Sequence, residues 1–298
     1  MKSQVEINGG LYQHWVAGNP LRALPYPSYI QNADMIFRFM QDKRWLSGQM
    51  PSINLAADYM AQLVNEQGLV SGAGYYVERP TRIEYDGVAQ CHVADAFYRT
   101  AMLNEAIGNQ ELKDKYQQIA KKITDCFNME FWQNGRCVEY INPVRGKISN
   151  HGLTDVDWSS IATGVITEEK IKQLWPQLQF NDRFYYGGMP TGIAVCPQKY
   201  EPWESTYPDS MDIASMGRVW FVECWARARM KDSIGLLKSL RQVCQVGSDN
   251  HYYWRERYNQ QGGYGAEKYC EYPANLIRIV QKFVLGHEYG LDGTLYIG

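Results

Sequence analysis

The chain lacks the features that mark several large classes of protein. No apolar run approaches the ~20 residues that a membrane span needs, and the N-terminus has no apolar segment of the signal-peptide kind. The formal net charge is only -2 over 298 residues, so we expect no basic face for a nucleic acid. These absences predict a cytoplasmic chain with neither a nucleic-acid partner nor a membrane partner.

Metal-binding and disulfide signals are also missing. The seven cysteines are odd in number and show no CxxC spacing, and the five histidines show no HxxxH spacing. A disulfide scaffold in a secreted protein, or a zinc site, would require such patterns. We therefore predict no metal and no cofactor.

Aromatic residues, in contrast, are plentiful. The sequence holds 22 Tyr and 9 Trp, many of them in segments that also contain Gly and Pro. Rings with a polar tip stack well on the apolar faces of sugars, although they also fill protein cores. This composition favours a carbohydrate substrate bound in an aromatic-rich cleft.

Apolar periodicity predicts one mostly helical domain over residues 1–298, with an irregular N-terminal segment at 1–27. Helical spacing is found over 28–43, 51–68, 88–107, 111–127, 168–178, 209–230, 233–246 and 273–286, and a further helix begins near 158. No βαβ alternation interrupts this pattern. The helix at 88–107 is apolar round most of its circumference and is followed by one with a lysine-rich face, which is typical of an inner helix paired with an outer one. Asn134-Gly135 predicts a β-hairpin at 131–140.

Three short segments carry a resemblance to a known superfamily. They are EYDGVAQC at 84–91, TDVDWS at 154–159 and FVLGHEYGLDGTL at 283–295. Through them the chain resembles the six-hairpin glycosidase superfamily, which implies an all-α fold, an (α/α)6 toroid of helical hairpins, here with a short β-hairpin insertion. A complete toroid has twelve helices and the pattern predicts about nine, so the prediction allows an incomplete ring.

The resemblance implies hydrolysis of a glycosidic bond by two carboxyl groups, usually with inversion, in a pocket where loops enter the inner helices. Asp157, just before Trp158, is our first candidate for the acid, with Asp155 placed to tune it. Asp86 has a similar context. Glu271 is the candidate base. The alternative for each is a structural role as a helix cap or as a partner of the helix dipole.

A further set of residues is predicted to bind the substrate through aromatic stacking or polar contacts. Each of them has packing or ion pairing as its alternative role, and Glu267 is also the second candidate base. The set comprises Tyr75, Tyr85, His151, Trp158, Trp203, Glu204, Trp254, Arg255 and Glu267.

Two other functions stay open. His151 and His251 lie in loops on the expected rim and could form the proton-transfer pair of a sugar epimerase of the N-acylglucosamine 2-epimerase type. A barrel without activity could also bind carbohydrate through its aromatic loops. The hydrolase hypothesis fails if Asp157 and Glu271 lie at opposite ends of the molecule, or if both are locked in buried ion pairs with no cavity between them.

Overall fold

The computed structural model describes most of the chain. The described residues are Lys2, 25–71, 84–152, 154–179, 185–186, 189–190, 203, 215–259 and 262–297. Tyr75 and Glu204, both predicted to bind substrate, lie outside them.

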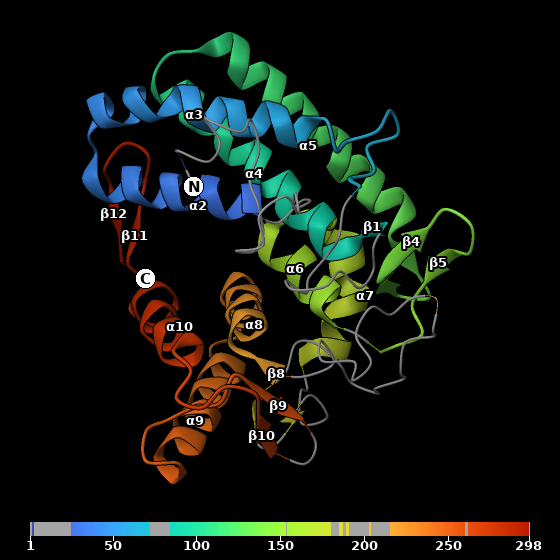
Figure 1. Ribbon diagram of the computed structural model, residues 1–298, viewed down its shortest axis with the longest axis vertical. Helices are drawn as coiled ribbons and strands as arrows, with labels where there is room; N and C mark the ends of the chain where they lie inside the picture. Colours follow the sequence, from blue (N-terminus) through green and yellow to red (C-terminus); the bar gives the residue numbers. More distant parts are fainter. Residues whose placement is uncertain are drawn as a thin grey trace.

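Helices dominate the described residues, which confirms the all-α prediction. There are nine α-helices and one π-helical turn in this part of the chain (Figure 1). They are α2 (Pro25–Met40), α3 (Lys43–Ala61), α4 (Gly87–Ala106), α5 (Gln110–Glu130), α6 (Asp155–Thr163), α7 (Glu168–Gln179), α8 (Gly217–Arg229), α9 (Ser233–Asp249), α10 (Glu271–Ile279) and η2 (Val280–Val284).

The strands of this part of the chain are two or three residues long and pair antiparallel. They are β1 (Tyr85–Asp86), β2 (Trp132–Gln133), β3 (Arg136–Cys137), β4 (Tyr140–Asn142), β5 (Gly146–Ile148), β6 (Tyr185–Tyr186), β7 (Met189–Pro190), β8 (Ser215–Met216), β9 (Arg257–Asn259), β10 (Gly262–Tyr264), β11 (Glu288–Tyr289) and β12 (Leu295–Tyr296). β1 pairs with β4 directly before α4, and β8 pairs with β9 directly before α8. These small sheets therefore hold the starting ends of two helices in place.

Inner and outer helices alternate along the chain, as the sequence predicted. In α4, 14 of 20 residues are buried, whereas its successor α5 buries only five of 21. The next pair repeats this: α6 buries eight of nine residues and α7 three of 12. A helix buried on all sides belongs to the interior, and one with a narrow apolar stripe covers it.

The inner helices α2, α4 and α6 run parallel to one another. Near the middle of α2, Gln31 donates a hydrogen bond to Asp95 of α4 at 2.9 Å. One turn later, Asp34 accepts a hydrogen bond from Arg99 of α4 at 2.5 Å. At the starts of α4 and α6, a Cβ built on Gly87 would lie only 2.6 Å from Val156. The start of one helix thus lies beside the start of the next, and the middle beside the middle, as in parallel helices.

The same order continues through α8 and α10. The ends of α6 and α8 meet where the Arg229 guanidinium covers Gly164, the residue after α6. The starts of α8 and α10 meet where a Cβ on Gly217 would lie 2.9 Å from Glu271. All five inner helices therefore begin at one end of the ring, which we call the mouth.

Loop lengths follow from this arrangement. Each inner helix leads into its outer partner through a few residues, as at 107–109 between α4 and α5, whereas the segments that return to the mouth are long. The β11–β12 hairpin follows α10 and reaches the far end of α2, where Arg38 donates to the Tyr289 carbonyl at 3.2 Å (Figure 1). It links the last described inner helix to the first.

Several predicted helix boundaries were wrong, two of them by eight residues. The helix predicted at 51–68 spans Lys43–Ala61, because the Asp42 carboxylate accepts the backbone N–H groups of Arg44 and Trp45 and so caps an earlier start. The helix predicted from 209 begins at Gly217, because Ser215–Met216 form strand β8 instead.

Candidate active site

Acidic side chains gather at the mouth, at the starts of three inner helices. Asp86 immediately precedes α4, Asp155 and Asp157 lie in the first turn of α6, and Glu271 is the first residue of α10. Negative charge is favourable at a helix N-terminus, so each position is stabilised locally. Because the inner helices are parallel, these acids share one end of the ring.

Asp86 has the contacts of a helix cap. Its Oδ1 accepts the backbone N–H groups of Val88 at 2.7 Å and Ala89 at 3.1 Å, and the residue is fully buried. An Asp at this position replaces two of the backbone partners that the first turn of a helix lacks. These contacts match the structural alternative given for Asp86.

Asp157 joins α6 to the β2–β3 hairpin. Its Oδ2 accepts Arg136 Nη2 at 2.5 Å, its Oδ1 accepts the Cys137 backbone N–H at 2.9 Å, and it is 1% exposed. The nearby carboxylate in turn raises the pKa of Arg136. An arginine pairs best with an ionised carboxylate, whereas a general acid must reach the substrate protonated. The contacts of Asp157 therefore suit anchoring better than proton donation.

Asp155 lies on the side of α6 that faces α4. Its Oδ1 accepts the Val156 N–H at 2.9 Å. Burial is the main cause of the raised pKa of Cys91 in α4, and the Asp155 charge adds to it; the same charge acts to raise the pKa of His92. Burial affects the pKa of His92 more strongly than the neighbouring charges do, so this pKa is lowered overall. Asp155 is thus a buried carboxyl group close to Cys91 and His92 of α4.

Glu271 is the most accessible of the mouth acids. It is paired with Arg218 of α8, whose Nε lies 2.9 Å from Oε1 and whose Nη2 lies 3.4 Å from Oε2, and its side chain is 17% exposed. The absence of a side chain at Gly217 lets the two helix starts approach this closely. Burial and the Glu271 charge together raise the pKa of Tyr269. An oriented and reachable carboxylate is what a general base requires.

His151 belongs to a buried pair that sequence analysis did not find. Its Nδ1 lies 2.6 Å from Glu139 Oε2, its backbone N–H donates to Oε1 at 3.1 Å, and its ring stacks on Tyr140. Both His151 and Glu139 are nearly inaccessible, whereas His251 is exposed in the turn after α9. No contact between described residues joins the two histidines.

The predicted aromatic residues divide into packed and accessible ones. Trp158 is fully buried, edge-to-face with Trp175, and contributes to the core. Trp203 is 39% exposed and lies under the Arg145 guanidinium at 4.3 Å. Tyr85, in β1 next to Asp86, is partly exposed at the mouth.

Trp254, Arg255 and Glu267 come together, but outside the ring. They line a cleft of about 660 Å³ between α9 and the 250–268 segment. Arg255 pairs with Glu267 at 2.5 Å, and Trp254 donates from Nε1 to the Val243 carbonyl of α9 at 3.0 Å. Since α9 is an outer helix, these residues do not face the interior of the ring.

Neither metal-binding nor membrane-spanning features occur in the described residues. Their His, Cys, Asp and Glu side chains form no group of three or more that could hold a metal ion. No helix among them is both long and apolar enough to cross a bilayer.

Comparison with known proteins shows the fold alone. No protein family profile and no curated protein sequence matches the chain. Among solved structures, it is similar to a GH78 family rhamnosidase from Bacillus sp. GL1, with a TM-score of 0.68 and 12% identity. This match covers 89% of the chain but only 26% of the rhamnosidase, so the chain spans about a quarter of that protein. It is also similar to an uncharacterized conserved protein from Thermus thermophilus, with a TM-score of 0.64, 8% identity and coverage of 88% and 79%.

Proposed function

We propose that the chain is a glycoside hydrolase whose active site is the mouth of the ring. The observation that carries the proposal is the gathering of acids from α4, α6 and α10 at the one end where the parallel inner helices begin. Likeness in fold to a GH78 family rhamnosidase supports the same reaction class, although a shared fold alone does not define a function.

Glu271 is the proposed base. It is held by Arg218 from the neighbouring helix, so it keeps a fixed direction while its side chain stays partly exposed. A carboxylate in this state can remove a proton from water as the water attacks the anomeric carbon. The partly exposed Tyr85 and Trp203 are proposed to contact the sugar through their rings.

The proposed acid lies at the start of α6. Asp157 was the first candidate, and its contacts with Arg136 and Cys137 make it a better positioning residue. We therefore place Asp155 first as the proton donor, since it lies in the same first turn of α6 and on the side that faces α4. Asp86 is proposed to fix the start of α4 beside them.

Release of reducing ends from a panel of aryl glycosides and oligosaccharides tests this proposal. We expect the wild type to release sugar from one of them, and we expect Asp155→Asn to reduce release far more than Asp86→Asn, provided both variants fold. Equal losses of sugar release for Asp155→Asn and Asp157→Asn would make Asp157 a candidate proton donor again. Conversion of a free sugar without release would instead support the epimerase, and sugar binding without either reaction would support a binding protein.

A further inference from the structure

A large cleft lies at the end of the ring opposite the mouth. Its volume is about 1510 Å³, and its lining comes from the middle and later turns of α4, from α5, from residues 163–165, from the later turns of α8, from η2 and from the β11–β12 hairpin. The space arises because α6 has nine residues against 20 in α4, so at about 1.5 Å per residue α6 ends some 16 Å short of a helix of that length. Along α10 and η2, Lys282 lies roughly 16 Å beyond Glu271 by the same measure. The cleft is therefore separate from the mouth.

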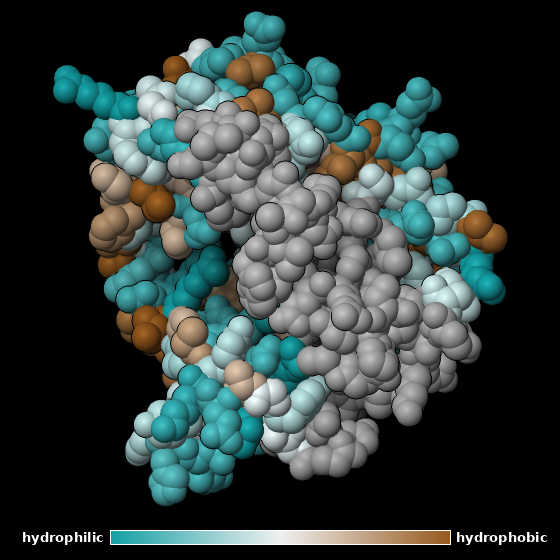
Figure 2. Space-filling model, in the orientation of Figure 1, coloured by the Kyte–Doolittle hydropathy of each residue, from teal (hydrophilic) through white to brown (hydrophobic). Residues whose placement is uncertain are grey.

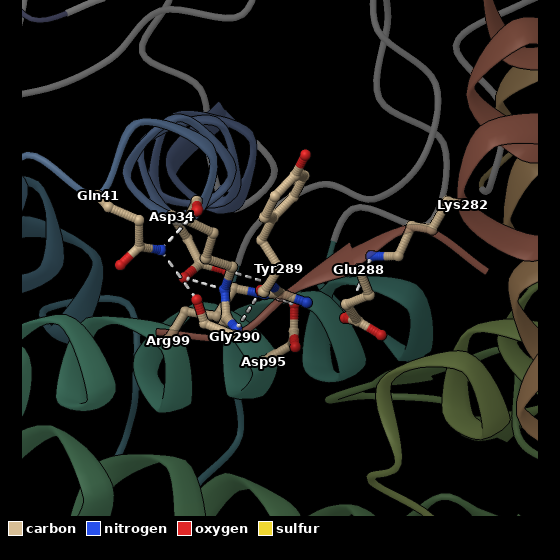
Figure 3. A network of polar contacts seen from close by, with 9 residues as sticks. Asp34, Gln41, Asp95, Arg99, Lys282, Glu288, Tyr289 and Gly290 are labelled. Atoms are coloured by element: carbon tan, nitrogen blue, oxygen red, sulfur yellow. Dashed lines mark hydrogen bonds and ion pairs between the residues drawn. The ribbon is translucent and has the colours of Figure 1, made fainter. Parts of the chain in front are cut away.

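One side of this cleft is a balanced set of charges. Arg99 contacts Asp34 at 2.5 Å and Asp95 at 2.7 Å, and Arg38 contacts Asp34 at 2.7 Å. Figure 3 shows this network together with the β11–β12 hairpin, where Gln41 donates to the Gly290 carbonyl. Two arginines meet two buried aspartates, so this side needs no further anion.

The other side of the cleft is not balanced. Lys282 has Glu288 as its partner, but Nζ and Oε1 are 3.9 Å apart and the Glu288 side chain is 58% exposed (Figure 3). Arg278, four residues earlier, is not part of the lining and makes no ion pair with any other described residue. Its guanidinium lies 4.0 Å above the Phe221 ring instead. Lys282 in the lining and Arg278 beside it thus have one distant, solvated carboxylate as their ion-pair partner among the described residues.

Lys282 and Arg99 lie beside the same aromatic ring. Trp225, which lines the cleft, has Arg99 at 5.9 Å and Lys282 at 5.8 Å from its ring centre. Burial lowers the pKa of Lys282 and of Arg278, and the Arg99 charge lowers both further. The fold therefore keeps Lys282, Arg278 and Arg99 close together, although each positive charge makes protonation of its neighbours less favourable.

We propose that this cleft binds a small organic oxyanion, a carboxylate or a phosphate ester, through Lys282 in its lining, with Arg278 reaching the anion from just outside the lining. An oxyanion would supply the charge that Glu288 provides only weakly, with the guanidinium giving paired N–H donors and the ammonium a point charge. Arg229 and Lys231, which also line the cleft, attract anions toward it. Figure 2 shows a hollow in the face of the molecule drawn there, and the coloured residues beside it are largely hydrophilic.

Calorimetric titration tests the proposal with four probes: inorganic phosphate, a hexose phosphate, a hexuronate and the uncharged hexose. We expect the wild type to bind at least one of the three anions and not the uncharged hexose at that site. Arg278→Gln and Lys282→Met should each weaken anion binding by about tenfold or more, which corresponds to about 1.4 kcal/mol. Lys172→Met removes an exposed charge from outer helix α7 and should leave binding unchanged. Tighter binding of the phosphate ester or of the hexuronate identifies the group that is recognised.

A second readout does not depend on the variants. In the wild type, NMR of the lysine side chains, assigned with Lys282→Arg, should place the Lys282 pKa below its ordinary value and show it rising when the anion binds. No binding of any anion, or equal binding by wild type, Arg278→Gln and Lys172→Met, would overturn the proposal. Since this site is distinct from the mouth, sugar release can fail while anion binding succeeds, and the reverse.

Discussion

Replacing Gly87 by Ala tests the close approach of α4 and α6 at the mouth. A Cβ at this position would lie 2.6 Å from Val156 Cγ1 and 2.9 Å from the Val138 carbonyl oxygen. The valine side chain has little freedom to rotate and the carbonyl belongs to the backbone, so neither neighbour can move away without shifting a main chain. Gly87→Ala should therefore force α4 and α6 apart.

The expected cost is that of adding a methyl group to a packed interface, about 1–3 kcal/mol of unfolding free energy. For a chain of this size, this corresponds to a fall in Tm of about 2 °C or slightly more per kcal/mol. Denaturant unfolding followed by far-UV circular dichroism measures the free energy, and differential scanning calorimetry measures Tm.

A matched control comes from Gly48, which is exposed inside α3. A Cβ there would have no neighbour within 4 Å, so Gly48→Ala should stabilise the protein by about 0.5–1 kcal/mol through backbone entropy. The double change Gly87→Ala with Val156→Ala should cost less than the sum of its parts, because the smaller side chain removes one clash. The reasoning is refuted if Gly87→Ala is as stable as Gly48→Ala.

Three further predictions concern charges and thiols. Arg136→Met leaves the buried Asp157 without its arginine and should lower the unfolding free energy by about 2–3 kcal/mol. This cost is lower than for a fully buried pair because the Arg136 side chain is a third exposed. A loss below about 0.5 kcal/mol, measured by urea titration, would contradict the prediction. Arg218→Met should change stability by no more than about 1 kcal/mol but strongly reduce sugar release by freeing Glu271, so a large stability loss with unchanged release would count against the proposed base. Burial raises the pKa of three thiols above the unfolded value of 9.0. Their contribution to the unfolding free energy is therefore complete below about pH 9 and is lost as the pH rises further. An unfolding free energy that stays constant above about pH 9 would disprove this prediction. These thiols are those of Cys91, Cys137 and Cys224.

Local signals in the sequence predicted much of the fold. Asn134-Gly135 does form the turn between β2 and β3, where both residues have positive φ, a conformation that Gly accepts freely and Asn tolerates. The contrast between an apolar helix and its lysine-rich successor identified α4 as inner and α5 as outer. These features depend on residues close together in the chain, so a single sequence contains them.

Some boundaries were missed although a signal was present. Asp42 is a good N-cap, but Pro51-Ser52 gave a competing start signal about halfway along the same helix. Pro51 is tolerated inside α3, and the periodic pattern before it should have extended the helix backward. The start of α8 depends on the pairing of β8 with β9, some 40 residues later, which no local pattern could reveal.

The candidate site was predictable in its acids but not in their partners. Asp155, Asp157 and Glu271 were found because they precede or open apolar helical runs. Their environment depends on residues far away in the sequence: Arg136 for Asp157 and Arg218 for Glu271. The roles proposed for the acids depend on those partners, so they could not be proposed before the fold was known.

The most direct test of the account is reducing-end release by Glu271→Gln beside the wild type, on whichever glycoside the wild type cleaves. The substitution preserves the shape of the side chain and removes its ability to accept a proton. We predict that release falls by at least about 1000-fold while binding of the glycoside is retained, because the base acts mainly in the transition state. Release at the wild-type rate by a folded Glu271→Gln protein would contradict the proposed site.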